Sequence, residues 1–73
     1  MQPHQQRVID ERAELEERIG RLVKFNGGPT FTKLPAAEQE RMVRQLSCMT
    51  ELSAILAERI AAFPVEPDHA ARP

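Results

Sequence analysis

The sequence has few of the residues that reinforce small proteins through covalent or metal bonds. Its 73 residues include one cysteine, Cys48, which excludes an intrachain disulfide and suits a reducing cytosol. The two histidines, His4 and His69, lie near opposite ends without a second ligand nearby, which disfavours a zinc site. A chain of this length buries a small core, and such domains commonly need a partner for stability. We therefore expect the chain to self-associate.

Long apolar runs are also absent. No segment approaches the roughly 18 consecutive apolar residues that a membrane-spanning helix requires. The first six residues, MQPHQQ, are polar and lack the apolar centre of a signal peptide. We therefore expect no membrane partner and an intracellular location.

The usual arrangements of catalytic residues are missing as well. No Ser/His/Asp or Cys/His combination has evident partners, and neither GxxxxGK[ST] nor GxGxxG occurs. Cys48 is interpreted as a small packing residue in the interior of a helix rather than as a nucleophile. The sequence therefore predicts a protein that is not an enzyme, has no catalytic residues and needs no cofactor.

Neither positive nor negative charge dominates the chain, but the charged residues are unevenly distributed along it. The net charge is −1, whereas residues 18–44 carry six basic side chains against two acidic ones. A general attraction to DNA is therefore not expected, and no helix gathers Arg and Lys as a recognition helix does. A local site for a small anion fits this distribution.

What the sequence does contain is helical periodicity. The first segment, from Pro3 to about Lys24, places apolar residues at a mean spacing of 3.5, and its seam is Val8, Leu15, Ile19 and Leu22. The second, from Pro35 to Phe63, alternates spacings of four and three along the seam Met42, Leu46, Met49, Ser53, Leu56, Ile60 and Phe63. We expect an all-α fold, a two-helix antiparallel hairpin that assembles into a helical homo-oligomer.

The second segment is apolar on more than one side. A flank outside its seam consists of Val43, Leu52 and Ile55. One neighbouring helix would not cover both the seam and this flank. We assign residues 1–63 to the oligomerising domain. Residues 64–73, with three prolines, are expected to form a disordered tail.

Each seam has one polar interruption, Arg12 in the first segment and Ser53 in the second. If the hairpin brings Leu22 near Val43, then Arg12 lies near Ser53. Alternatively, Arg12 extends its aliphatic stem over the apolar surface and keeps its charge in water. The carboxylates of the first segment are interpreted as a solvated face.

The connecting stretch, KFNGGPTFTKLP, has two interpretations that the residues leave open. In the first, a glycine in the left-handed conformation ends the first helix and Pro29 blocks its continuation. In the second, the stretch also binds an anion through backbone N–H groups, hydroxyls and ammonium groups. The residues concerned are Lys24, Gly27, Gly28, Thr30, Thr32 and Lys33.

Three strings carry a resemblance to a known family: HQQRVIDERAELEERIGRL, FNGGPTFTKLPAAEQERMVRQLSCM and ILAERIAAF. Over residues 4–63 the chain resembles the phage anti-CBASS sponges. The resemblance implies a small helical hexamer that binds cyclic dinucleotides, and cyclic trinucleotides in a second pocket, without cleaving them. It also implies action in the cytoplasm of the host bacterium.

The resemblance further implies roles for particular residues. Thr30 would contact a phosphate with Gly27 and Gly28 beside it, and Lys24 or Lys33 would neutralise charge, in sites shared between subunits. Arg59 is the candidate for the second pocket at a threefold junction.

One departure from the family pattern concerns base stacking. The first helix of relatives carries an aromatic side chain that stacks on a base, whereas the zone Glu11–Arg12–Ala13 has none and the chain contains neither Tyr nor Trp. An arginine plane also stacks on bases, so Arg12 is expected to take this role. The alternative function is a helical module that binds another protein and no nucleotide.

Overall fold

The structure is a computed structural model that describes residues 2–64, and these residues form helices joined by short connections, with no strand among them. Helix α1 spans Pro3–Asn26, α2 spans Pro29–Thr32 and α3 spans Ala36–Ala61. The all-α prediction is confirmed. The short α2 was not predicted, and all of the proposed tail except Pro64 lies outside the described residues.

Helix α1 begins with a proline, whose missing N–H is no loss in the first turn. The backbone N–H of Gln2 donates to the side-chain Oε1 of Gln5 at 2.9 Å, which holds the helix start in place. Gln5 is buried although its neighbours are exposed. The helix then runs two residues beyond the predicted end at Lys24.

The way in which α1 ends differs from the prediction. Gly27 has φ −91° and ψ 0°, and no glycine of the described residues has a positive φ, so the left-handed ending was wrong. Gly28 is extended instead, with φ −99° and ψ 175°, and Pro29 follows as the first residue of α2. The chain leaves the helix at this extended residue and immediately starts another turn of helix.

The connection into α3 is fixed by one side chain. Nε2 of Gln39 donates to the carbonyl oxygen of Leu34 at 2.9 Å and lies 3.4 Å from that of Thr32. Pro35 caps α3, and Glu38 lies in its first turn, where the helix dipole favours an acid. The predicted start at Pro35 is thus correct to one residue.

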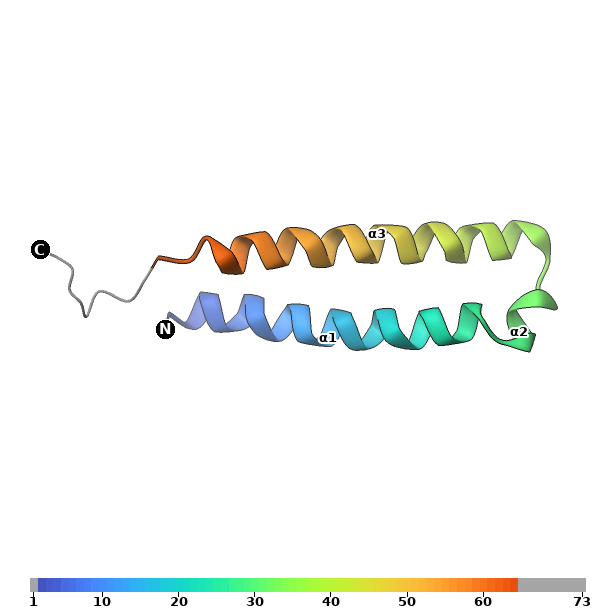
Figure 1. Cartoon of the computed structure of the whole chain (residues 1–73), viewed down its shortest axis with the longest axis horizontal. Helices are drawn as coiled ribbons and strands as arrows, with labels where there is room; N and C mark the ends of the chain where they lie inside the picture. The colour runs from blue at the N-terminus through green and yellow to red at the C-terminus, as the bar shows by residue number, and fades with distance from the viewer. Residues whose placement is uncertain (1, 65–73) are drawn as a thin grey trace, which may run out of the picture.

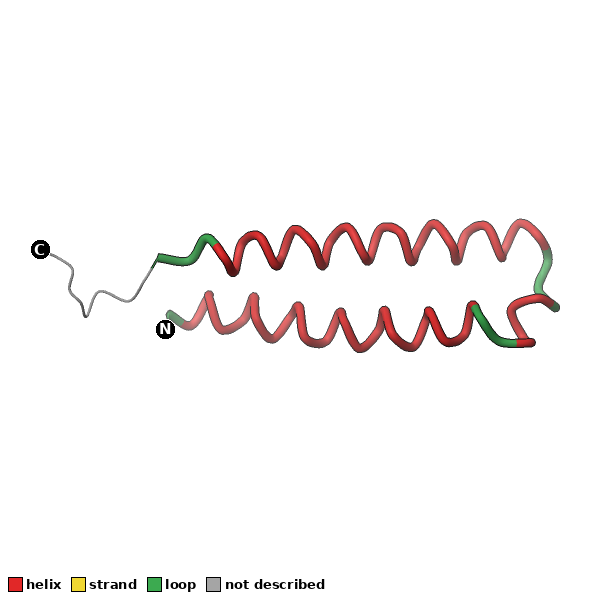
Figure 2. The backbone as a smooth tube through the Cα atoms, in the orientation of Figure 1, coloured by secondary structure: helices red, strands yellow, loops and turns green. Residues whose placement is uncertain are grey.

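Helices α1 and α3 lie side by side and run in opposite directions, with α2 at the end where the chain reverses (Figure 1; Figure 2). The buried apolar core between them is small and consists of Val8, Leu15 and Leu56. Around it pack the partly buried side chains of Ile19, Met49, Ile60 and Phe63. All seven belong to the two predicted seams.

Much apolar surface remains outside this core. Val43 is 54% exposed, and Leu52 and Ile55 are 41% and 42% exposed. Cys48, which was expected in the interior, is exposed. Cys48, Leu52 and Ile55 follow one another at spacings of four and three residues, so they share a flank of α3 that does not face α1. Val43 was expected on this flank but does not belong to it, because it lies about two and a half turns before Leu52 and so on the opposite side of the helix. No described helix is both long and apolar enough to cross a lipid bilayer.

Candidate ligand-binding site

The residues selected from the sequence fall in three separate places. Gly27, Gly28, Thr30 and Lys33 lie in α2 or directly beside it, and Lys24 lies in the last turn of α1. We call this closed end of the hairpin, from the last turn of α1 through α2 to Lys33, the tip. Arg12 lies near the middle of α1, 12 residues before Lys24, or about 18 Å along the helix. Arg59 lies in the last turn of α3, about 35 Å from its start. A single chain therefore unites the tip residues but not Arg12 or Arg59 with them.

The two threonines of the tip differ in what their hydroxyl groups do. Thr32 Oγ1 donates to the carbonyl oxygen of Pro29 at 2.8 Å and so closes the turn of α2. Thr30 is exposed, and within residues 2–64 nothing forms a hydrogen bond with its hydroxyl. Thr30 is thus the hydroxyl of α2 that is free to reach a ligand.

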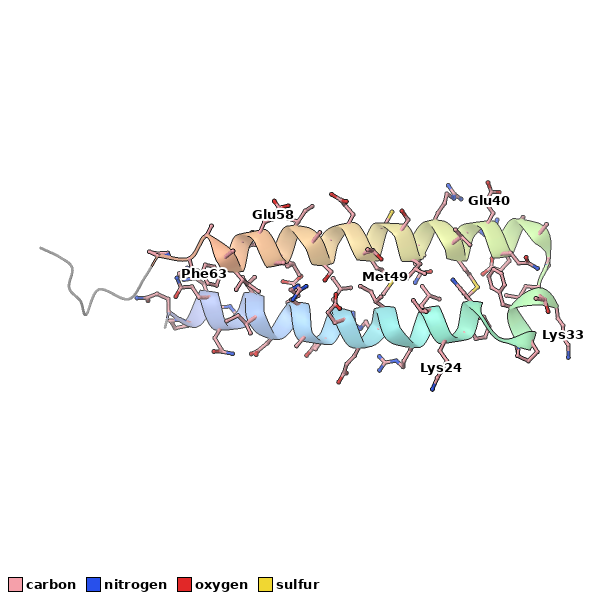
Figure 3. The ribbon with its side chains drawn as sticks, in the orientation of Figure 1. Lys24, Lys33, Glu40, Met49, Glu58 and Phe63 are labelled. Carbon is pink, nitrogen blue, oxygen red and sulfur yellow. The ribbon has the colours of Figure 1, made fainter. Side chains whose placement is uncertain are left out.

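The tip also carries two exposed ammonium groups. Lys24 points away from α3, and Lys33 projects from the end of the molecule where α2 lies (Figure 3). The ion pairs found between described residues join Arg21 to Glu17 and Arg41 to Glu38, and neither includes a lysine. Both lysines can therefore offer their charge to an anion.

The glycines do not form the anion-binding nest that the sequence suggested. The N–H of Gly27 donates to the carbonyl oxygen of Val23 at 3.1 Å, and that of Gly28 donates to Phe25 at 3.0 Å. A nest requires alternating right- and left-handed residues with free N–H groups, and neither glycine has a positive φ. What the glycines offer a ligand is the absence of a side chain. Their contact with ligand stays a prediction.

Asn26, which sequence reasoning did not select, adds a polar group to the tip. Its Oδ1 atom is buried and has no hydrogen-bond partner among the described residues. An unpaired buried acceptor costs about 1–3 kcal/mol. The only sequence signal for it was an asparagine directly before Gly27-Gly28, which is also an ordinary helix ending.

Arg12 and Ser53, the polar residues that interrupt the two seams, contact each other. Nε of the half-buried Arg12 donates to the backbone oxygen of Ser53 at 3.1 Å, so the predicted proximity of Arg12 and Ser53 is confirmed. The Ser53 hydroxyl donates to the carboxylate of Glu16. Glu16 therefore does not belong only to a solvated face, since its long side chain reaches α3.

A metal centre finds no support in this geometry. Within the described part of the chain, no three His, Cys, Asp or Glu side chains are placed so that they could hold a metal ion. The polar groups available are hydroxyl, ammonium and guanidinium donors, which suit phosphate and base recognition.

Comparison with known proteins identifies one family. A family model described as Sequestin matches residues 2–62, which include α1, α2 and α3. No match is found among curated proteins or among solved structures. Sequestin denotes a sequestering, non-catalytic family, that of the anti-CBASS cyclic-nucleotide sponges, so the resemblance is confirmed. The chain belongs to the Sequestin family.

Proposed function

We propose that the protein sequesters cyclic di- and trinucleotide second messengers without cleaving them, and thereby blocks anti-phage CBASS signalling in the cytoplasm of the host bacterium. The observation that carries the proposal is the family match over residues 2–62. The free donors of the tip support it, because they are the groups that a phosphodiester would require.

At the tip, the hydroxyl of Thr30 donates to a phosphate oxygen, and Lys24 or Lys33 neutralises the charge. Gly27 and Gly28 carry no side chain and so let the ligand approach the backbone closely. A β-carbon at either glycine would instead lie in van der Waals contact with carbonyl oxygens of α1, 3.5–3.9 Å away. A hydrogen bond to a charged acceptor is about twice as strong as one between neutral groups.

Base recognition falls to Arg12, whose planar guanidinium stacks on a base. Because Arg12 and the tip of the same chain are about 18 Å apart along α1, a compact ligand touches Arg12 of one chain and the tip of another. A cyclic dinucleotide has near-twofold symmetry, so it would meet matching residues from two chains. Arg59, at the far end of α3, would serve the second pocket for cyclic trinucleotides.

This arrangement requires a homo-oligomer, for which the resemblance implies a hexamer. The exposed Val43, Leu52 and Ile55 supply apolar surface that further chains would cover. Assembly would both complete the core and create the shared sites.

Calorimetry with cyclic GMP–AMP, cyclic di-AMP and cyclic tri-AMP tests the proposal. We expect heat of binding at micromolar concentrations with at least one of them, and intact ligand when the complex is denatured and analysed by chromatography. Absence of heat with all three ligands contradicts sequestration. Recovery of linear products instead would identify a nuclease.

A second candidate function rests on the same exposed flank. Leu52 and Ile55 could bind a different protein rather than another copy. That function predicts a co-purifying partner and no affinity for cyclic nucleotides, so the calorimetry separates the two.

A further inference from the structure

We propose that Ser53 is a positioning residue that keeps Arg12 and Glu16 apart, so that no carboxylate compensates the positive charge of Arg12 and its remaining N–H groups are free for an anionic ligand. This inference rests on the proposed function, because it concerns how the site is prepared for its ligand.

The spacing of Arg12 and Glu16 would ordinarily favour an ion pair. They lie four residues apart on α1, and such side chains are neighbours on a helix surface. The next acid–base pair along the same helix shows the usual behaviour: Arg21 Nη1 lies 3.9 Å from Glu17 Oε1. Among residues 2–64, however, Arg12 forms no ion pair with Glu16.

Ser53 explains the difference, because it presents two polar groups of opposite character to α1. Its backbone oxygen accepts from Nε of Arg12, and its hydroxyl donates to the Glu16 carboxylate. Ser53 is only 3% exposed, whereas Arg12 is half-buried and Glu16 is exposed, so both contacts are partly buried. Ser53 therefore binds the guanidinium of Arg12 and the carboxylate of Glu16 through two different groups.

Most hydrogen-bond donors of Arg12 remain free for a ligand. A guanidinium has five N–H groups, and the contact with Ser53 uses only the one on Nε. The two Nη nitrogens and the flat faces of the group remain for phosphate or base contacts. If Glu16 were paired with Arg12, an anionic ligand would first have to displace a carboxylate held on the same helix.

Replacement of Ser53 by alanine should therefore weaken binding indirectly. In Ser53→Ala the Glu16 carboxylate loses its partner on α3 and pairs with Arg12. We expect the affinity for the best-binding cyclic dinucleotide to fall about fivefold, the factor that matches the upper range of an exposed ion pair. Adding Glu16→Gln to Ser53→Ala removes the competing charge and should restore the affinity.

A readout without ligand separates this inference from the proposed function. The Nε–H signal of Arg12 in ¹⁵N–¹H NMR spectra of the free, full-length protein should shift in Ser53→Ala and return toward its original position in the double variant. If these shifts occur but no cyclic nucleotide binds the wild type, the proposed function fails while the separation of Arg12 from Glu16 stands.

Two controls keep the inference falsifiable. Glu17→Gln removes a neighbouring acid whose partner is the exposed Arg21, and it should leave the affinity within twofold of wild type. Glu16→Gln alone should bind at least as well as wild type, and this variant retains Ser53 should Ser53→Ala fail to fold. A loss of affinity in Glu16→Gln, or no rescue in the double variant, overturns the inference.

Discussion

The contrast between the two threonines of α2 gives the sharpest test of the tip. Thr30→Ala removes the hydroxyl that has no partner in the described structure, whereas Thr32→Ala removes the one that donates to Pro29. Both substitutions delete the same atoms from the same four-residue helix. The two variants therefore lose the same atoms and differ only in which hydrogen bond is lost.

The expected magnitudes follow from these contacts. A hydrogen bond to a charged acceptor contributes about 1.5–3 kcal/mol, so one lost contact from Thr30 to phosphate weakens binding roughly 10- to 100-fold. A twofold-symmetric ligand that meets two copies loses both contacts, which places the effect at or above the top of that range. Thr32→Ala should instead cost about 1 kcal/mol of local turn stability and little affinity.

Isothermal titration calorimetry of both variants measures the affinities, and size-exclusion chromatography with light scattering checks that assembly is intact. We expect Thr30→Ala to assemble normally and bind weakly. Equal affinity in Thr30→Ala and wild type would remove Thr30 from the site. Equal losses in both variants would show that α2 matters as a fold element and not through its free hydroxyl.

Three further outcomes are expected. Lys24→Ala and Lys33→Ala should each weaken binding up to about fivefold. Calorimetry at two ionic strengths should show that the difference in affinity between each variant and the wild type becomes smaller at high salt. Leu56→Ala removes the most deeply buried side chain, at 2% exposure, and should lower the free energy of unfolding by about 2–5 kcal/mol in urea titrations at fixed protein concentration. Leu52→Glu places a charge on the exposed flank and should reduce the mass measured by light scattering, whereas unchanged mass would exclude this flank from the assembly interface.

The two long helices could be predicted from the sequence because their periodicity extends over many turns. The seam alternation from Met42 to Phe63 is unambiguous, and it also located Ser53 opposite Arg12. Helix α2 could not be found in this way, since four residues contain barely one turn and show no period. The pair Gly27-Gly28 suggested a left-handed ending, but neither glycine has a positive φ, and the chain leaves α1 through the extended Gly28 before Pro29.

The site was less predictable than the fold because its geometry depends on long side chains and, in the function that we propose, on other copies of the chain. Periodicity placed Glu16 outside the seam and did not reveal that its carboxylate reaches the hydroxyl of Ser53. Composition identified Lys24, Thr30 and Lys33 as anion-binding types, and their exposure agrees with that role. The distance of about 18 Å between Arg12 and Lys24 follows from a continuous first helix, which the sequence did predict.

The physical reason for placing recognition between chains is the same as the reason for expecting assembly. Only Val8, Leu15 and Leu56 are buried apolar residues in the described hairpin, and the flank of Leu52 and Ile55 is open to water. A ligand that spans Arg12 of one copy and the tip of another binds only the assembled form. By mass action it therefore stabilises that form, and dilution that separates the copies also removes the site. The apparent affinity for the ligand and the stability of the oligomer are therefore thermodynamically linked, and each should rise with the other.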